Sequence, residues 1–204
     1  MTKVDFKKEF KHLYSPSATK PGLVDVPPLD FLMIDGHGDP NTAPAYREAI
    51  EALYAVAYAL KFMSKGQLDR DYTVPPLEGL WWAADPTAFT RADKDTWDWT
   101  MMIMQPSWIT PDMVQAAIAG TAARKPLPAL ALLRSEVYHE GLSAQIMHIG
   151  PYAAEAPTIA RLHAFIQEQG YVPAGKHHEI YIGDPNRTAP EKLKTVLRHP
   201  VARV

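Results

Sequence analysis

A short segment near the end of the chain combines a carboxylate, a phenol and histidines at strand spacing. The sequence HHEIY begins at residue 177, and successive side chains of a strand point to opposite faces. Glu179 therefore shares one face with His177 and Tyr181. The opposite face, with His178 and Ile180, is expected to be apolar. We expect Glu179 to lie at the floor of an aromatic pocket, where a carboxylate activates water or attracts a cation, although strand carboxylates more often pair with Lys or Arg.

Aromatic side chains are abundant, with five Trp and nine Tyr residues in the chain. Such side chains either fill a core or line a surface that binds flat molecules. Trp81 and Trp82 point to opposite faces of a predicted strand, so one of them is expected to face a ligand and the other the core. Trp97 and Trp99 share one face of the next predicted strand. About half of the Trp residues are assigned to the core.

The apolar pattern predicts an alternation of strands and helices. Strands are predicted over residues 29–34, 74–83, 97–106, 130–139, 142–149, 177–182 and 195–198. Helices are predicted to begin at Pro44, Pro111 and Pro157, because proline suits the first turn of a helix. A hairpin is expected at the turn formed by residues 140 and 141, and Thr188 is expected to cap a short helix.

The two halves of the chain repeat the same order of elements. In each half, an apolar strand is followed by a glycine turn, an Ala-Pro helix start, an amphipathic helix and two strands. We therefore predict an α+β fold of pseudo-twofold, duplicated β-α-β-β units with antiparallel sheets, helices on one side and a ligand cleft on the other. Residues 1–28 are predicted to form an N-terminal strap and residues 29–204 one domain, with repeats over about 29–124 and 129–204.

Composition and motif spacing exclude several classes of function. Lys and Arg number 21 and Asp and Glu 23, without a basic run, so no nucleic-acid partner is expected. The absence of cysteine excludes disulfides and thiolate chemistry. Neither metal-ligand spacing nor a GxSxG serine elbow occurs, so we predict no metal, no cofactor and no acyl-enzyme. Because no apolar run could span a bilayer and no signal peptide is visible, we expect a cytoplasmic location and no membrane contact.

Two motifs carry a resemblance to a known family: GLWW at residues 79–82 and HHEIYIGDPNRTAPEKLKT at residues 177–195. From about Leu29 onward the chain resembles the GyrI-like small-molecule-binding family. The fold of this family is shared with effector-binding domains of drug-sensing transcription activators, in which a glutamate at the position matching Glu179 meets cationic aromatic ligands. Lacking their helix-turn-helix, the chain is similar to the stand-alone branch. Some members of that branch hydrolyse the strained cyclopropane of cyclopropanoid DNA-alkylating antibiotics.

The resemblance implies a cofactor-free hydrolase that detoxifies aromatic genotoxins. Glu179 would then be the base that orients water, and Tyr181 or Tyr138 would donate a proton to the carbonyl that becomes a phenolate. The residues expected to bind the flat substrate are Trp81, Trp82, Trp97, Trp99, Tyr46, Phe89, Tyr152 and His177. The alternative is a protein that binds and sequesters aromatic compounds, cationic ones included, without chemistry. Contact with a topoisomerase follows only from the family's name and ranks last.

Overall fold

The structure of the protein is a computed structural model that describes residues 3–85 and 93–203. It divides into two compact units, each assembled from separate segments of the chain. Unit 1 comprises Met1–Phe6, Leu29–Pro75 and Trp81–Tyr138, and unit 2 comprises Lys7–Pro28, Pro76–Leu80 and His139–Val204. The predicted α+β class with antiparallel strand pairing is confirmed. Among the described residues, no helix has the length and apolar character needed to cross a bilayer.

Unit 1 is built on a pair of long apolar strands. β2 (Leu29–His37) pairs antiparallel with β4 (Asp98–Gln105), and β5 (Arg134–Tyr138) pairs with the other edge of β2. β3 (Leu77–Trp82), whose last two residues belong to this unit, follows β4 in the strand order. Because residues 31–34 and 101–104 are all buried, the centre of this sheet is apolar on both faces.

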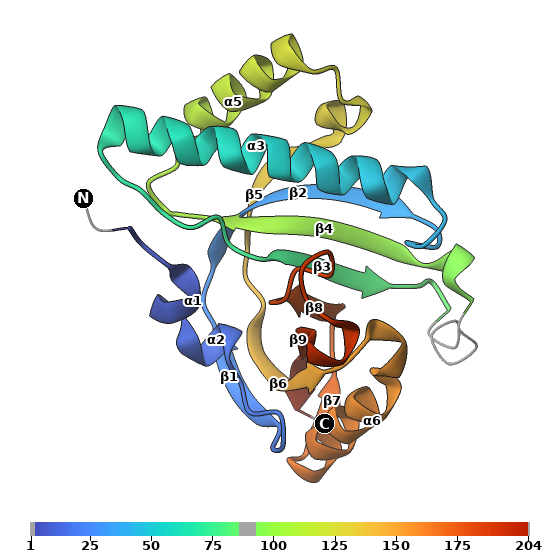
Figure 1. The fold of residues 1–204 in the computed structure, drawn as a ribbon. Helices are drawn as coiled ribbons and strands as arrows, with labels where there is room; N and C mark the ends of the chain where they lie inside the picture. The colour runs from blue at the N-terminus through green and yellow to red at the C-terminus, as the bar shows by residue number, and fades with distance from the viewer. Residues whose placement is uncertain (1–2, 86–92, 204) are drawn as a thin grey trace. The chain divides into compact units, whose positions relative to one another are not determined.

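The helices of unit 1 begin where the sequence predicts. α3 (Pro44–Leu68) starts at its proline and runs along β2 and β4 (Figure 1). It buries Leu53, Val56 and Leu60. α5 (Pro111–Arg124) packs against α3, and the Thr110 hydroxyl caps it by accepting a hydrogen bond from the Met113 N–H. The short 3-10 turns η1 (Lys94–Thr96) and η2 (Pro128–Leu132) complete the unit.

Unit 2 repeats this plan with a shorter helix. Its sheet runs in the order β1 (Gly22–Val26), β6 (Gly141–Ile149), β9 (Lys194–Arg203) and β8 (His177–Tyr181), and β7 (Tyr171–Pro173) pairs with β9. α6 (Ala156–Glu168) packs against β6 and β7, and its Leu162 and Ile166 join Ile146 in the core. The remaining elements are α1 (Phe6–Glu9), α2 (Lys11–Tyr14), η3 (Tyr152–Ala154) and η4 (Pro190–Lys192).

The predicted duplication is present, but β1 and β5 each pair with a strand from the other half of the chain. The order strand, helix, strand, strand occurs as β2-α3-β3-β4 and again as β6-α6-β8-β9, and in each case the first strand pairs antiparallel with the last. β1 comes directly before β2 along the chain but pairs with β6. β5 comes directly before β6 but pairs with β2. The strands of each unit therefore include one from the opposite half of the sequence.

Two local predictions are wrong. The expected hairpin at residues 140 and 141 does not form, because the strands on either side of this turn pair with β2 and with β1 and β9. The turn still needs its glycine, since Gly141 has a φ of +72°. The helix expected after Thr188 is only the 3-10 turn η4, which begins after Ala189 and has no side-chain cap. The final strand is longer than predicted and extends over Lys194–Arg203.

Candidate functional site

Two predicted side chains lie against one carboxylate on β8. Tyr181 follows Glu179 by two residues, so both side chains lie on one face of the strand, and the Tyr181 hydroxyl donates a hydrogen bond to Glu179 Oε2 at 2.9 Å. His177 Nε2 lies 3.3 Å from Glu179 Oε1, close enough for an ion pair but not aligned for a hydrogen bond. The side chains of His177 and Glu179 are only 12% and 16% exposed.

Tyr152 adds aromatic surface to this group. It lies in η3, and its ring meets the Tyr181 ring edge-on with centroids 5.6 Å apart. With 40% of its surface exposed, Tyr152 is accessible to a ligand from solvent. We call Glu179, Tyr181, His177 and Tyr152 the Glu179 cluster. The cluster combines the Glu179 carboxylate, the hydrogen-bonded phenol of Tyr181, the Tyr152 ring and the His177 imidazole, all within unit 2.

Two further histidines lie behind His177. The His199 ring on β9 is 5.8 Å from the His177 ring and 5.4 Å from the His163 ring on α6. Burial, followed by the nearby His177 and His163, lowers the pKa of His199 to about 3, and burial together with His177 lowers the pKa of His163. Both side chains are therefore neutral at pH 7. Over residues 3–85 and 93–203, no group of three or more His, Asp or Glu side chains is arranged to hold a metal ion.

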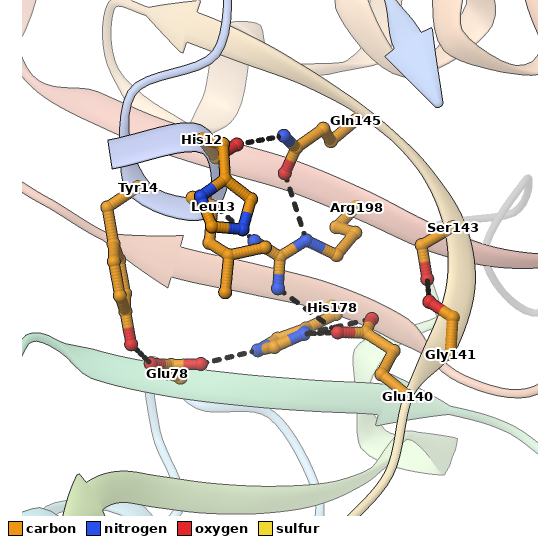
Figure 2. A network of polar contacts seen from close by, with 10 residues as sticks. All are labelled: His12, Leu13, Tyr14, Glu78, Glu140, Gly141, Ser143, Gln145, His178 and Arg198. Atoms are coloured by element: carbon orange, nitrogen blue, oxygen red, sulfur yellow. Dashed lines mark hydrogen bonds and ion pairs between the residues drawn. The ribbon is translucent and has the colours of Figure 1, made fainter. Parts of the chain in front are cut away.

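The other face of β8 is not apolar, which corrects the prediction. His178 is 1% exposed, and its ring lies between two buried carboxylates (Figure 2). Its Nε2 is 2.9 Å from Glu78 Oε2, and its Nδ1 is 3.0 Å from Glu140 Oε2. Because each ring nitrogen faces a carboxylate, both carry a proton and the ring is an imidazolium. Burial alone would lower the pKa of His178, but the charges of Glu140 and Glu78 and the hydrogen bonds to them raise it to about 9.

A buried arginine balances the second carboxylate. Arg198 Nη1 lies 3.1 Å from Glu140 Oε2, while its other nitrogens donate to the Leu13 carbonyl and to Gln145 (Figure 2). Burial opposes the ionised form of Glu140, yet His178 and Arg198 lower its pKa to about 2. Two carboxylates and two cations make the buried network of Glu78, His178, Glu140 and Arg198 electrically neutral, as a buried ionic group must be to persist. The Tyr14 hydroxyl completes it by donating to Glu78 Oε1 at 3.0 Å.

The alternation of side chains along β8 and β9 predicts this network. The expectation that the opposite face of β8 is apolar missed it. His178 alternates with buried Ile180, and Arg198 with buried Val196, so both charged side chains occupy inward positions of their strands. Fully buried charges are rare unless they are paired. Charged residues in the inward register of several strands therefore predict that they pair with one another.

The predicted Trp residues of unit 1 divide between core and surface. Trp81 is buried between Tyr46 and Trp97, with ring centroids 6.0 and 5.9 Å away, and Trp82 beside it is partly exposed. Trp99 is fully buried, meets the Tyr46 ring edge-on at 5.3 Å and donates its indole N–H to the Gly38 carbonyl. Trp99 thus belongs to the core and exposes no surface to a ligand.

Tyr138 and Phe89 are the remaining predicted site residues. Tyr138, at the end of β5 in unit 1, meets the Phe31 ring edge-on with centroids 6.4 Å apart. Phe89 lies outside the described residues. Within unit 2, a cavity of about 380 Å³ is lined by Lys7, Lys8, Lys11, Tyr14, Ser15 and Ile182. It contains three lysines and none of the predicted site residues, so its charge does not suit the cationic ligand expected near Glu179.

The fold agrees with comparisons to known proteins. The model of the family described as GyrI-like small molecule binding domain matches residues 19–202. Two solved structures from Listeria innocua, one of an uncharacterized conserved protein and one of a protein named a hydrolase, are each 40% identical to this chain, with TM-scores of 0.91 and 0.86. Each match covers 98% of this chain and 100% of the other.

A more distant likeness shows the fold alone. The C-terminal domain of EcmrR is 11% identical, with a TM-score of 0.56 over 91% of this chain and 98% of that domain. No curated protein sequence matches the chain. The family match over most of the chain and the two relatives at 40% identity are sufficient for an assignment. The chain belongs to the GyrI-like small molecule binding domain family.

Proposed function

We propose that the Glu179 cluster binds flat aromatic small molecules, cationic ones included, and hydrolyses the activated cyclopropane of cyclopropanoid genotoxins. The observation that carries this proposal is the 2.9 Å hydrogen bond from the Tyr181 hydroxyl to Glu179 Oε2, which joins an acid and a base. The family assignment supports small-molecule binding, and a relative at 40% identity is named a hydrolase.

Binding uses the charge and the rings of the cluster. A carboxylate that is largely removed from solvent attracts a cation more strongly than an exposed one, because water screens the interaction less. The Tyr152 and Tyr181 rings, edge-on to each other, offer π-faces to a flat or cationic ligand. The same surface accepts a neutral polycyclic compound through stacking and burial of apolar area.

Hydrolysis uses Glu179 as the base. A water oxygen bonds to the cyclopropane carbon, the strained C–C bond breaks, and its electron pair moves through the conjugated ring to the carbonyl oxygen. Glu179 accepts the proton that the water loses. Tyr181 donates a proton to the new phenolate and regains one from Glu179 through the existing hydrogen bond, so both residues return to their starting state. This relay favours Tyr181 over Tyr138 as the donor.

The test follows the absorbance of a cyclopropanoid compound incubated with purified protein. Glu179→Gln should lower kcat by about 100-fold or more, the usual contribution of a positioned general base, while a neutral aromatic product still binds. Tyr181→Phe should lower kcat without a comparable rise in KM. Glu191→Gln, which alters an exposed carboxylate in the same unit, is the matched control. Turnover by Glu179→Gln at the wild-type rate would remove Glu179 from the mechanism.

Binding without chemistry is the second candidate function. It is favoured by the surroundings of Glu179, whose two oxygens both face protein groups, Tyr181 at 2.9 Å and His177 at 3.3 Å. Stoichiometric binding, followed by recovery of the unchanged cyclopropanoid after long incubation, would select this function over hydrolysis.

A further inference from the structure

The cavity of unit 2 is lined by positive charge. Its volume of about 380 Å³ lies within the range of small-molecule sites. The lining residues come from α1, from α2 and the residue after it, and from the residue that follows β8: Lys7, Lys8, Lys11, Tyr14, Ser15 and Ile182. We call this the lysine cavity. Because three lysines and no carboxylate are among these described residues, the cavity attracts an anion and repels a cation.

Two of the three lysines offer their ammonium groups to a ligand. Lys8 and Lys11 are exposed, and over residues 3–85 and 93–203 neither side chain makes an ion pair or a hydrogen bond. Glu9 lies between them in the sequence but does not line the cavity. Neighbouring ammonium groups repel one another, and an anion placed among them replaces this repulsion by attraction. An anion therefore stabilises the lysine cavity.

The helix that carries Lys11 is held in place by buried side chains. Each of the last three residues of α2 makes one hydrogen bond to such a side chain (Figure 2): the His12 carbonyl accepts from Gln145 at 2.6 Å, the Leu13 carbonyl accepts from Arg198 at 2.7 Å, and the Tyr14 hydroxyl donates to Glu78 at 3.0 Å. The backbone on this side of the lysine cavity is thus fixed before a ligand arrives, which reduces the entropy lost on binding.

The lysine cavity also has an apolar side. Tyr14 is 4% exposed, and burial together with the charge of Glu78 raises the pKa of its phenol, so Tyr14 adds no negative charge. Ile182 is partly buried, and its N–H donates a hydrogen bond to the Lys194 carbonyl at 3.0 Å, which fixes its position beside β9. Ser15 contributes a hydroxyl that can donate to an anionic oxygen. The lining therefore suits a ligand that combines an acidic group with an apolar body.

We propose that the lysine cavity binds a small organic anion, with its acidic group among the lysines and its apolar part against Tyr14 and Ile182. The site goes beyond the proposed function, because it shares no residue with the Glu179 cluster and has the opposite charge. Ile182 directly follows Tyr181, but successive side chains of a strand point to opposite faces. A ligand in the lysine cavity and one at Glu179 thus lie on different faces of this segment.

A small anion suits the lysine cavity better than a nucleic acid does. Binding of a nucleic acid requires a series of cations that follows the phosphates, and the chain has no basic run beyond these lysines. An inorganic anion would leave the side formed by Tyr14 and Ile182 unused. Both the charge and the apolar surface of the cavity are used only by an anion that carries an apolar group.

Naphthalenesulfonate is a suitable probe because it joins a permanently charged group to a flat apolar ring. Isothermal titration calorimetry at pH 7 should show binding of one molecule per chain. The neutral naphthalenesulfonamide and inorganic sulfate should each bind at least about tenfold more weakly, since the first lacks the charge and the second lacks the apolar body. An equal affinity for the sulfonamide contradicts the role of the lysines, and an equal affinity for sulfate contradicts the role of the apolar side.

A pair of double variants locates the probe. Lys8→Gln with Lys11→Gln should lower the affinity for naphthalenesulfonate about tenfold, because an exposed ion pair contributes up to about fivefold. Lys20→Gln with Lys192→Gln removes the same charge from exposed sites of unit 2 outside the cavity, and should bind like wild type. Equal affinities of the two double variants, or no binding to wild-type protein, would overturn the proposal.

Salt dependence in wild-type protein decides if the first double variant does not fold. Raising the ionic strength from about 0.1 M to about 1 M shortens the screening length from about 10 Å to about 3 Å, so the affinity for naphthalenesulfonate should fall severalfold. Binding of the neutral sulfonamide should not weaken under the same change. An affinity for naphthalenesulfonate that does not fall with salt is incompatible with an anion held by lysines. Neither result bears on hydrolysis at Glu179, which is followed with a different compound.

Discussion

Titration of the buried network should change the free energy of unfolding within a defined pH window. The pKa of His178 is raised from 6.5 to about 9, so its contribution to stability is fully present below pH 6.5 and is lost as the pH rises through 9. The pKa of Glu140 is lowered from 4.5 to about 2, so its contribution is present above pH 4.5 and is lost as the pH falls toward 2. The network therefore stabilises the fold most between pH 4.5 and 6.5.

The expected size follows from the change in pKa. Since a tenfold change in an equilibrium is about 1.4 kcal/mol, the rise for His178 from 6.5 to about 9 corresponds to about 3 kcal/mol. The contributions of His178 and Glu140 are not added, because both arise largely from the same contact between the two residues. A loss of about 3 kcal/mol is a large fraction of the stability of a typical domain.

Glu140→Gln tests the cause of this pH dependence. The amide cannot balance His178 and Arg198, which would leave a buried excess of positive charge and cost about 3–5 kcal/mol at pH 6. Because Glu140 is the main group that raises the pKa of His178, the variant should also lose less stability than wild type between pH 6 and pH 9. Glu191→Gln, at an exposed site, should change stability by less than about 0.5 kcal/mol.

Urea unfolding at pH 6, 7.5 and 9 measures these differences. Circular dichroism is the suitable signal, because helices and strands occur in both units whereas all five Trp residues lie in unit 1. Taking the difference between wild type and Glu140→Gln at each pH cancels the titration of groups that the substitution does not affect. A difference of less than about 1 kcal/mol at pH 6, or one that stays constant up to pH 9, would refute the reasoning.

Substitutions at three positions of unit 1 test its packing and its helices. A Cβ at Gly36 would lie 2.0 Å from the Trp99 ring, so Gly36→Ala should destabilise the protein by about 1–3 kcal/mol in urea unfolding. Gly66→Ala, in helix α3 with nothing within 4 Å of the new Cβ, should instead stabilise it by up to about 1 kcal/mol, and a loss there would contradict the assignment of an open helical site. Thr110→Ala should cost about 1 kcal/mol by removing the cap on the Met113 N–H, and Thr110→Ser should retain most of that stability in thermal unfolding.

Elements fixed by local signals could be predicted from the sequence. α3 and α5 start at Pro44 and Pro111, because proline at the first helical position and the apolar period that follows are properties of neighbouring residues. The prediction of a hairpin at residues 140 and 141 was wrong because strand pairing there is not local. Its turn and flanking apolar residues suit a hairpin, but β5 and β6 each pair with strands that are distant in sequence. Local patterns do not specify such partners.

The candidate site shows the same division. Alternation along β8 is enough to place Glu179 and Tyr181 on one face, and in the structure a hydrogen bond joins them. The burial of a charged His178 could not be predicted from alternation. A buried imidazolium is stable only with Glu78 and Glu140, which come from other segments of the chain. Sequence pattern thus predicts which residues share a face, whereas the partners of a buried charge depend on the assembled fold.

The pairing of β1 and β5 with strands of the other half of the chain affects how the protein folds during synthesis. Val26 of β1 pairs with Gly141 of β6. β1 therefore cannot pair with β6 until most of the chain has been synthesised. The β2–β4 pair can form earlier, but its sheet has an open edge until β5 emerges. A gene cut between the two repeats would yield one fragment without β5 and another without β1. Neither repeat is therefore expected to fold alone, because each needs a strand that the other half of the chain supplies.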